Sequence, residues 1–291
     1  MRILLLGAGG LLGRHLVAEL PHHGHALTAL THPEADITDT HRLDELFRQP
    51  WDAVINTAAV CNFDLCENAP DVTARINRDA PLDLADRCHA QGAKYVQFSS
   101  DYVFRGDLER PLTERDAPAP LSAYGRQKAD IEKEIPHRCP QSLVLRISWL
   151  YGAGGKTFMS LLPSLLASDS SLRVAAGKTG RCLYAPDGAE WTRLLLESPR
   201  TGLVNLVNDG DTSWEQFAHA CLDEMDAAGL HPRCRSILEV PYADLGPNWS
   251  KRPHHSALDI STLSREFPPG PRPWREALAA FVRTQKSFAE R

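Results

Sequence analysis

The sequence of 291 residues contains no apolar run long enough to cross a bilayer. The run from Ile3 to Leu6, which follows Met1 and Arg2, is too short for a membrane span, and no signal-peptide cleavage pattern follows it. We therefore expect the first strand of the fold to begin at the N-terminus. We also expect no membrane partner and a cytoplasmic location.

The sequence also lacks a strong excess of positive or negative residues and closely spaced pairs of cysteines. The formal net charge is −5 without long runs of one sign, which excludes the basic stripe of a nucleic-acid-binding protein. The seven cysteines form no C-x-x-C pair, and no two cysteines or histidines have zinc-finger spacing. An odd number of scattered cysteines is typical of reduced thiols. We therefore expect no disulfide framework and no metal site, and we assign the histidines around Gly24 to an exposed turn.

The sequence does contain a regular alternation of short apolar runs and helical patterns. The hydrophobic fraction of 43% and the charged fraction of 24% are ordinary for a globular protein. The patterns predict strands at 3–6, 25–30, 54–59, 94–99, 143–149 and 203–207. They predict helices at 11–20, 40–48, 69–91, 123–135, 158–166, 214–228 and 274–283, the third interrupted near Pro81.

Strand–helix–strand repetition of this kind calls for a mostly parallel sheet with helices on both faces. The sequence therefore predicts an α/β fold with a Rossmann-type doubly wound parallel sheet in residues 1–150. The pattern loosens after Tyr151, which predicts a smaller mixed α/β C-terminal substrate lobe in residues 151–291. Segments of this lobe are expected to return to the first domain.

A glycine-rich turn lies between the first predicted strand and the first predicted helix. Gly7, Gly10 and Gly13 form the pattern G-x-x-G-x-x-G. A tight turn, close approach to a pyrophosphate and close packing of helix on strand each favour a residue without Cβ. The helix then begins at Leu11 and Leu12, where unpaired N–H groups can face phosphate. The turn predicts a dinucleotide-binding site.

The choice of dinucleotide depends on the next two loops. The second predicted strand ends at 30–32 without an acidic residue that could bind a ribose 2′-hydroxyl. Arg14 is either a partner for a 2′-phosphate or a solvated helix residue. These observations favour NADPH and leave NADH open. Asp36 and Ile37 are expected to flank the adenine.

Tyr124 and Lys128 form a Y-x-x-x-K motif on the predicted helix 123–135. Residues four apart share a helix face, so the Lys128 ammonium can lie beside the phenol and lower its pKa from about 10. Tyr124 would then exchange a proton near neutral pH. An exposed helix pair is the alternative interpretation.

Two serines end the fourth predicted strand, upstream of this motif. Strand ends line the ligand crevice of a parallel sheet, so a Ser100 hydroxyl there can bond a substrate carbonyl while Tyr124 protonates it. The glycine turn, the strand-end serine and Y-x-x-x-K occur in that order, and together they are more specific than any one alone.

In these motifs the sequence resembles the extended short-chain dehydrogenases/reductases and, within them, the dTDP-4-dehydrorhamnose reductases. The likeness spans nearly the whole chain, and the run Ser-Ser-Asp-Tyr-Val-Phe is the most specific to this branch. The segments that carry it are Gly7 to Gly13, Asn56 to Ala59, Ser99 to Phe104, Pro118 to Lys128, Arg146 to Tyr151 and Arg252 to His254.

The resemblance implies an NAD(P)H-dependent reductase that passes a hydride to C4 of a nucleotide-linked 4-keto-6-deoxysugar, as in dTDP-rhamnose biosynthesis. Ser100 would orient the carbonyl oxygen, Tyr124 would donate the proton, and Lys128 would hold the nicotinamide ribose and tune Tyr124. Three further residues at the ends of predicted strands are expected to contact the cofactor: Ala58, Ala59 and Ser99.

The resemblance also implies where the substrate lies. Tyr102 and Trp149 match positions that contact the sugar, with core packing as the alternative for both. Arg252 lies where a basic residue could meet the diphosphate. The nucleotide-sugar is the expected partner, and a homodimer is left open.

Two segments depart from the family pattern. Many members carry Asp-Gln-Tyr/Phe-Gly-x-Pro-Thr in the substrate lobe, whereas this chain has Gly180 to Asp187 with only the proline kept. The segment Val60 to Phe63 also departs from the common polar sequence. A different nucleotide-sugar or another carbonyl substrate therefore stays open.

Two alternative functions remain. The regulatory β-subunit of methionine adenosyltransferase resembles this fold and shares the Ser-Ser-Asp-Tyr-Val-Phe run, and it works by binding a partner enzyme with NADP as a structural ligand. A nucleotide-sugar epimerase or dehydratase would instead keep NAD tightly bound. The missing acidic residue at the tip of the second strand argues against that second alternative.

Overall fold

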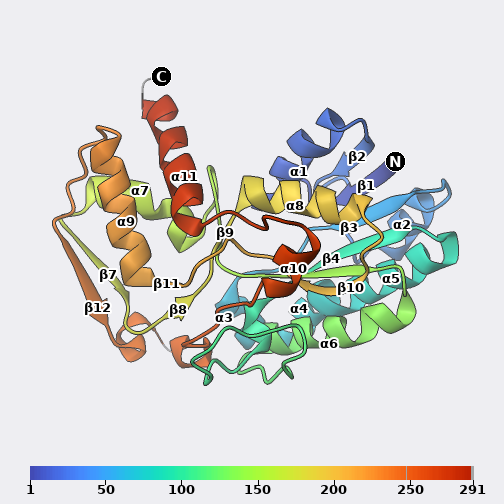
Figure 1. Cartoon of the computed structure of the whole chain (residues 1–291). Coiled ribbons are helices and arrows are strands. Elements are labelled where there is room, and N and C mark those ends of the chain that lie inside the picture. The colour runs from blue at the N-terminus through green and yellow to red at the C-terminus, as the bar shows by residue number, and fades with distance from the viewer. Residues whose placement is uncertain (247, 290–291) are drawn as a thin grey trace.

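The computed structural model describes residues 1–246 and 248–289, and its centre is a six-stranded parallel sheet (Figure 1). The strand order β10-β5-β4-β3-β1-β2 confirms the predicted doubly wound sheet. Because β1 lies between β2 and β3, the chain reverses direction across the sheet at β1, and such a switch point opens a crevice. The strands are β1 Arg2–Leu6, β2 Ala26–Leu30, β3 Ala53–Asn56, β4 Lys94–Ser100, β5 Leu143–Ile147 and β10 Gly202–Asn205.

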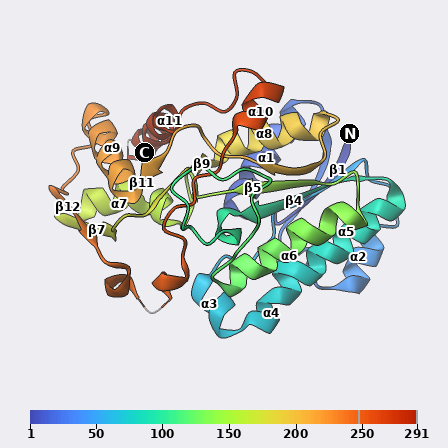
Figure 2. The same cartoon turned by 60° about the horizontal axis from the view of Figure 1, so that its bottom comes forward.

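Helices cover both faces of this sheet because its strands are apolar on both sides. Ile3 and Leu5 of β1 face the helices α1 (Leu11–His22) and α8 (Ala185–Glu197). Leu4 and Leu6 face the opposite layer, formed by α2 (Thr40–Leu46), α5 (Ala80–Gln91) and α6 (Ala123–Arg138). Figure 2 shows α1 and α8 above the sheet and α5 and α6 below it. This alternation is the two-residue period of a strand buried on both faces.

The predicted helix 69–91 is interrupted directly before Pro81, as expected. It consists of α4 (Pro70–Ala74), a π-helical turn (Arg75–Asp79) and α5, and a further helix, α3 (Phe63–Asn68), precedes it. Pro81 has no N–H to donate to the carbonyl four residues earlier, and the wider turn lies before it. Within this turn Asn77 is buried and bonds to both the N–H and the carbonyl of Val60.

A second body with its own core follows β5, at the left of Figure 1. Tyr151, Phe217 and Phe281 meet in this core with ring centroids 5.2 and 5.4 Å from Tyr151. The parallel pair of β7 and β12 and the short strand pairs of this body were not predicted. Helix α8, which belongs to the first body and packs against α1, was not predicted either. The elements of the second body are β6 Leu150–Tyr151, α7 Phe158–Ser168, β7 Ser171–Ala175, β8 Thr179–Gly180, β9 Leu183–Tyr184, β11 Thr212–Ser213, α9 Trp214–Ala227, β12 Ser236–Val240 and α11 Trp274–Ala289. Helix α10 (Ser261–Glu266) instead packs through Leu263 against the core of the first body.

Two features are absent from residues 1–246 and 248–289. None of the helices there combines the length and apolarity of a membrane span. No group of three or more His, Cys, Asp or Glu side chains there is arranged to hold a metal ion.

Candidate active site

The predicted motifs meet at the carboxyl ends of β1, β3, β4 and β5. The glycine turn after β1 touches the loop after β3, because a Cβ on Gly7 would lie 2.5 Å from the Ala58 nitrogen. Ser100 is the last residue of β4 and pairs in register with Ile147, the last residue of β5. The polar ends of neighbouring parallel strands therefore form one edge, as expected for a ligand site in this fold.

The three glycines of the turn have different roles. Gly7 has φ +82°, a left-handed conformation, and donates its N–H to the Leu30 carbonyl. A Cβ on Gly13 would lie 2.4 Å from the Gly7 oxygen, so Gly13 lets α1 pack close to β1. A Cβ on Gly10 would meet only the Gly7 oxygen, at 3.3 Å. Packing within the protein therefore demands glycine at 7 and 13 but leaves the space at Gly10 for a ligand.

The first turn of α1 lies directly behind that space. Its N-cap is Gly10, which has no side chain to cap the first N–H groups, and the turn contains no acidic residue. Leu12 is buried in the core between α1 and the sheet, whereas Leu11 lies against the loop at Gly152 and Gly155. These two leucines can therefore offer their backbone N–H groups to a phosphate.

Arg14 and Glu34 lie where they affect the choice between NADPH and NADH. Arg14 is exposed and donates from Nη2 to the Gly154 carbonyl at 2.9 Å. The expectation that no acidic residue lies at the tip of β2 is wrong. A turn brings Glu34 back to Thr31, whose N–H and hydroxyl donate to its carboxylate at 2.8 and 2.7 Å. These hydrogen bonds lower the pKa of Glu34.

The other residues expected to contact the cofactor are Asp36, Ile37, Ala58 and Ala59, and most of them could meet it only with main-chain atoms. Asp36 accepts two hydrogen bonds from Thr38, which lower the pKa of Asp36. Ile37 is buried in the core below the sheet, so only its main chain faces outward. Ala58 donates its N–H to the side chain of Asn56 at the end of β3, and Ala59 follows half-buried.

Tyr124 and Lys128 lie one turn apart on α6, which begins against the β4 end. Ser122 caps this helix by accepting a hydrogen bond from the Gly125 N–H. A Cβ on Gly125 would lie 2.2 Å from the backbone carbonyl oxygen of Tyr102, so the absence of a side chain at Gly125 lets α6 pack close to the segment at Tyr102. Lys128 is buried, its Nζ donates to the Phe98 carbonyl at 3.0 Å, and the same nitrogen lies 5.7 Å from the Tyr124 ring centroid.

The expected net lowering of the Tyr124 pKa is wrong, because burial outweighs any influence of Lys128. Burial raises the pKa of Tyr124 well above its usual range, and the neighbouring Cys61 and Asp101 raise it further, while a hydrogen bond with Ser100 lowers it. Burial also lowers the pKa of Lys128, which weakens the cation that was expected to favour a phenolate. Tyr124 is therefore a protonated phenol, as a proton donor must be.

Ser100 lies between Tyr124 and a buried carboxylate. Its hydroxyl donates to Asp101 Oδ1 at 3.1 Å and accepts from the Tyr102 N–H at 3.2 Å. The Tyr102 ring meets the Tyr124 ring edge-on at a centroid distance of 5.9 Å. Burial raises the pKa of Tyr102 to about 12, so its hydroxyl stays protonated. Ser100, Tyr102 and Tyr124 thus form one cluster.

Trp149 and Arg252 reach this cluster from the second body. Trp149 has φ +40°, an uncommon conformation for a bulky residue, and its ring packs against Gly180, where a Cβ would lie 2.8 Å from the indole. Its Nε1 is buried without a hydrogen-bond partner. Arg252 Nη1 lies 3.4 Å from the Tyr102 hydroxyl, and its guanidinium stacks on Phe63. Arg252 therefore contacts Tyr102 directly, whereas Trp149 and Tyr102 share a neighbour, the Lys178 nitrogen, which lies 5.6 and 5.7 Å from their ring centroids.

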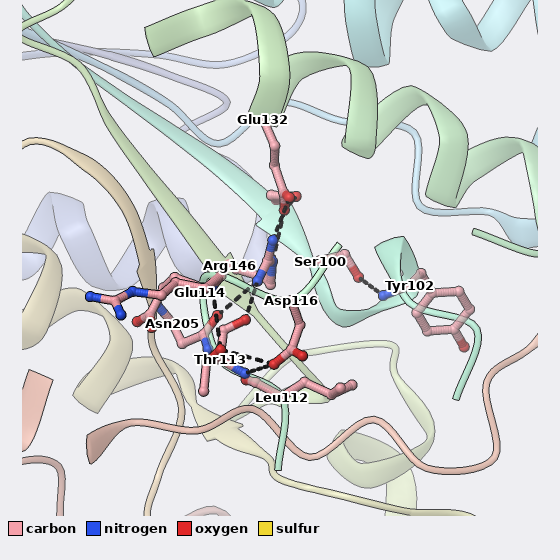
Figure 3. A network of polar contacts seen from close by, with 11 residues as sticks. Ser100, Tyr102, Leu112, Thr113, Glu114, Asp116, Glu132, Arg146 and Asn205 are labelled. Carbon is pink, nitrogen blue, oxygen red and sulfur yellow. Dashed lines mark hydrogen bonds and ion pairs between the residues drawn. The ribbon is translucent and has the colours of Figure 1, made fainter. Parts of the chain in front are cut away.

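Ser99, expected on the cofactor, has its hydroxyl committed elsewhere. It donates to Glu132 Oε1 at 2.5 Å, and Glu132 also receives two hydrogen bonds from Arg146, at 2.9 and 2.6 Å. Figure 3 shows Arg146 reaching from Glu132 toward Asn205 and Thr113. Glu132 lies one turn after Lys128, so this buried network joins α6 to β4, β5 and β10. Any contact of Ser99 with a cofactor must use its backbone.

Three residues beside this site were not singled out from the sequence. Asp101 and Lys178 are both buried, and Cys61 lies close enough to Tyr124 to raise its pKa. Asp101 could have been noticed because it follows the strand-end serines directly. Neither Cys61 nor Lys178 belongs to a chemical motif, and only the folded chain brings them to the site.

A family model described as the RmlD substrate binding domain matches residues 1–287. The chain belongs to this family. The resemblance inferred from the motifs is thereby confirmed, and the match extends over both bodies of the fold.

Individual relatives agree with this assignment. SpsK of Bacillus subtilis, a spore coat polysaccharide biosynthesis protein, is 33% identical and aligns over 99% of each chain. The dTDP-4-dehydrorhamnose reductase of Mycobacterium tuberculosis is 33% identical, covering 96% of this chain and 91% of its own. The solved dTDP-4-dehydrorhamnose reductase of Bacillus anthracis, in complex with NADP, has a TM-score of 0.88 at 26% identity and covers 96% of this chain and 98% of its own.

Proposed function

We propose that this protein is an NAD(P)H-dependent reductase of a nucleotide-linked 4-keto-6-deoxysugar, of the dTDP-4-dehydrorhamnose reductase type. The observation that carries the proposal is the cluster of Ser100, Tyr124 and Lys128 at the sheet edge, next to the glycine turn. The dTDP-4-dehydrorhamnose reductases among the relatives support the same reaction.

The roles of the three residues follow from their surroundings. A bound reduced nicotinamide supplies the hydride. Tyr124, kept protonated by burial, donates its proton to the oxygen at C4 as negative charge develops there. Ser100 would hold that oxygen in place by turning its hydroxyl proton from Asp101 Oδ1 to the substrate. Lys128 uses one ammonium proton on the Phe98 carbonyl and keeps the others for the nicotinamide ribose and for the field at Tyr124.

The glycine turn suits a dinucleotide on its own geometry. The open space at Gly10 and the uncapped N-terminus of α1 would receive the pyrophosphate, with the N–H groups of Leu11, Leu12 and Gly13 directed at it. Adenine contacts would come from Asp36 and Ile37. Ala58, Ala59 and the Ser99 backbone would follow the cofactor toward the cluster.

NADPH is the cofactor we favour, because the Bacillus anthracis relative binds NADP. The structure adds a reason to keep NADH. Glu34 places a carboxylate at the tip of β2, where it can accept hydrogen bonds from ribose hydroxyls and repels a 2′-phosphate. Arg14 remains a candidate for the 2′-phosphate only if it leaves the Gly154 carbonyl.

The substrate would lie between the two bodies of the fold. Tyr102 and Trp149 would contact the sugar and Arg252 the diphosphate, since all three surround the Tyr124 cluster from different segments. This arrangement supports the predicted division into a cofactor domain of residues 1–150 and a substrate lobe of residues 151–291, from which α8 and β10 return to the first domain. In the same proposal the seven free thiols support a reducing, cytoplasmic setting. A homodimer stays a prediction.

The test is nicotinamide oxidation with dTDP-4-dehydrorhamnose generated in the assay, measured with NADPH and then with NADH. We expect Tyr124→Phe to lower kcat by about 10²-fold or more, because general acid catalysis is lost. NADPH affinity should change little, because the ring remains. Tyr151→Phe is the matched control, since it removes another buried phenol oxygen that has no hydrogen-bond partner and lies outside the site.

Each other outcome identifies an alternative. Equal turnover by Tyr124→Phe and Tyr151→Phe would remove Tyr124 from the mechanism. Tight NADPH binding without oxidation would favour a regulatory subunit or a different carbonyl substrate. NAD that stays bound through purification, with no net oxidation, would favour an epimerase or a dehydratase.

A further inference from the structure

Glu67 is a nearly buried carboxylate that the proposed chemistry does not use. It lies on α3, and its side chain is only 6% exposed. One carboxylate oxygen accepts the Ala123 N–H at 2.5 Å, and the other receives the Lys251 ammonium. Burying a carboxylate costs free energy unless charges and hydrogen bonds replace its contacts with water. The two partners therefore indicate which parts of the molecule Glu67 joins.

The first partner begins the helix that carries the proposed proton donor. Ala123 is the first residue of α6, and the first four N–H groups of a helix have no partner within the helix. Ser122 accepts the N–H of Gly125, and the Glu67 carboxylate takes another of these groups. A negative charge near this end also stabilises a helix. Because Tyr124 follows Ala123 directly, Glu67 fixes the start of α6 and with it the position of Tyr124.

The second partner belongs to the segment that contains Arg252. Lys251 directly precedes Arg252, the residue proposed for the diphosphate. The Arg252 guanidinium lies 4.6 Å from the ring centroid of Phe63, the first residue of α3, and 4.3 Å from that of Trp249. Helix α3 therefore supports Arg252 in two ways, through the Phe63 ring and through the ion pair of Glu67 with the neighbouring Lys251.

The Glu67–Lys251 ion pair is the better shielded of the two polar contacts between α3 and this segment. The other contact, from the Asn248 amide to the Asp64 carboxylate at 2.8 Å, lies at the exposed surface. Burial raises the pKa of Glu67, but the hydrogen bonds from Lys251 and from α6 outweigh this effect and lower the pKa. Glu67 is therefore ionised at neutral pH. Because its carboxylate is largely shielded from water, the attraction to Lys251 is screened less than that of a fully exposed pair.

We propose that Glu67 is a positioning residue that couples the two ends of the substrate site. Its contact with Lys251 holds Arg252 toward the diphosphate, and its contact with α6 holds Tyr124 toward the sugar carbonyl. The carboxylate thereby fixes the spacing between the group that anchors the nucleotide and the group that donates the proton. This inference rests on the proposed function, because Arg252 and Tyr124 must contact the two ends of one substrate for that spacing to matter.

Two replacements of Glu67 separate its two contacts. In Glu67→Gln the amide oxygen can still accept the Ala123 N–H, whereas the charge that attracts Lys251 is lost. We expect KM for dTDP-4-dehydrorhamnose to rise by about threefold to tenfold while kcat stays within about twofold of the wild type, because a binding contact away from the reacting atoms is weakened. The rise is moderate because the Lys251 side chain is 44% exposed. Glu67→Ala also frees the start of α6, so kcat should fall by about tenfold as well, since Tyr124 is less well placed.

Cofactor affinity and a matched control distinguish positioning from general damage. The NADPH affinity of Glu67→Gln, measured by fluorescence titration without sugar, should stay within about twofold of the wild type, because Lys251 and Arg252 act on the sugar side of the site. Glu19→Gln is the matched control. Glu19 of α1 also joins two helices, since the Arg193 side chain of α8 donates to its carboxylate at 2.7 Å, but it lies near the end of α1 away from the glycine turn. Its kcat and KM should equal those of the wild type.

Replacing Lys251 tests the coupling from the other side. Lys251→Met should raise KM to the same extent as Glu67→Gln and leave kcat within about twofold of the wild type. In Glu67→Gln/Lys251→Met the rise should not exceed the larger single effect, because both changes break the same contact. Rises that add would mean that Lys251 acts on the substrate by itself, and they would overturn the inference.

Two further results overturn it: a wild-type KM in Glu67→Gln, or a kcat in Glu67→Ala equal to that of Glu67→Gln. If Glu67→Ala does not fold, Glu67→Leu is assayed in its place, since an apolar side chain of similar size suits a buried position and also accepts no hydrogen bond. Absence of keto-sugar turnover in the wild type would instead overturn the proposed function. Wild-type turnover together with an unchanged KM in Glu67→Gln would overturn the role of Glu67 alone, so the two failures are distinct.

Discussion

Replacing Glu132 by glutamine tests the buried ion pair that fixes α6 to the sheet. Glu132 and Arg146 have side chains only 4% and 1% exposed, and their closest N–O distance is 2.6 Å. The carboxylate also accepts the Ser99 hydroxyl, so it holds β4 and β5 at once (Figure 3). The glutamine amide in Glu132→Gln keeps the shape of the side chain but leaves the Arg146 charge without a counter-ion.

The expected cost follows from that uncompensated charge. Breaking a buried ion pair by removing one partner costs about 3–5 kcal/mol, whereas the weak bonds of Arg146 to Asn205 and Thr113, at 3.3 and 3.4 Å, replace little of it. For a chain of this size each kcal/mol lowers Tm by about 2 °C, so we expect a drop of roughly 6–10 °C. Because Lys128 lies one turn away, kcat should fall as well.

Thermal unfolding of the purified variant gives the change in Tm, and urea unfolding gives the change in the free energy of unfolding. Asp86→Asn is the control. Asp86 of α5 pairs with Arg138 of α6 at 2.7 Å, but both side chains are well exposed, and such pairs contribute about 0–1 kcal/mol. If Glu132→Gln were no less stable than Asp86→Asn, the buried ion pair would not be what holds α6, and our account of how Lys128 is placed would be refuted.

Three further outcomes are expected. Gly10→Val should weaken dinucleotide affinity by about tenfold or more in a fluorescence titration, because its side chain fills the space meant for the pyrophosphate; normal affinity would contradict the turn's role. Glu34→Gln should raise the ratio of kcat/KM for NADPH over NADH by about fivefold, relative to Glu45→Gln on α2, because a charge near the 2′-phosphate is removed. Burial lowers the pKa of Lys178 to about 8 in the folded protein, whereas the unfolded chain has a value of about 10.4, so the unfolded chain binds more protons between these two pH values. The free energy of unfolding should therefore rise with pH in this window. Lys178→Met should lack that rise.

The sheet and its switch point could be predicted because local patterns decide them. The four apolar residues of β1 alternate between two helical layers, which is why a short apolar run before a glycine turn identified the first strand. The glycine turn and Y-x-x-x-K were recognisable because backbone geometry fixes their spacing.

Helix α8 shows where local patterns were insufficient. Its start was interpreted as a degraded substrate motif around 180–187, although Pro186 at the first turn of a helix is a known start signal. The segment buries Asp187 and Arg193, so its polar residues obscured the helical period. Asp187 pairs with Arg272, and Arg193 pairs with Glu19 of α1. These partners are distant in sequence, and only tertiary contacts make the pattern consistent.

The pKa values in the site depend on how deeply each side chain is buried, and the spacing of residues in the sequence does not predict burial. Tyr124 and Lys128 have the expected separation, yet burial raises the pKa of one and lowers that of the other. Lys178 lies beside Tyr102. The residue after it, Thr179 of β8, bonds to the irregular segment around His255, and no sequence pattern indicated this contact. A motif thus predicts which residues can do chemistry, while the fold decides their protonation.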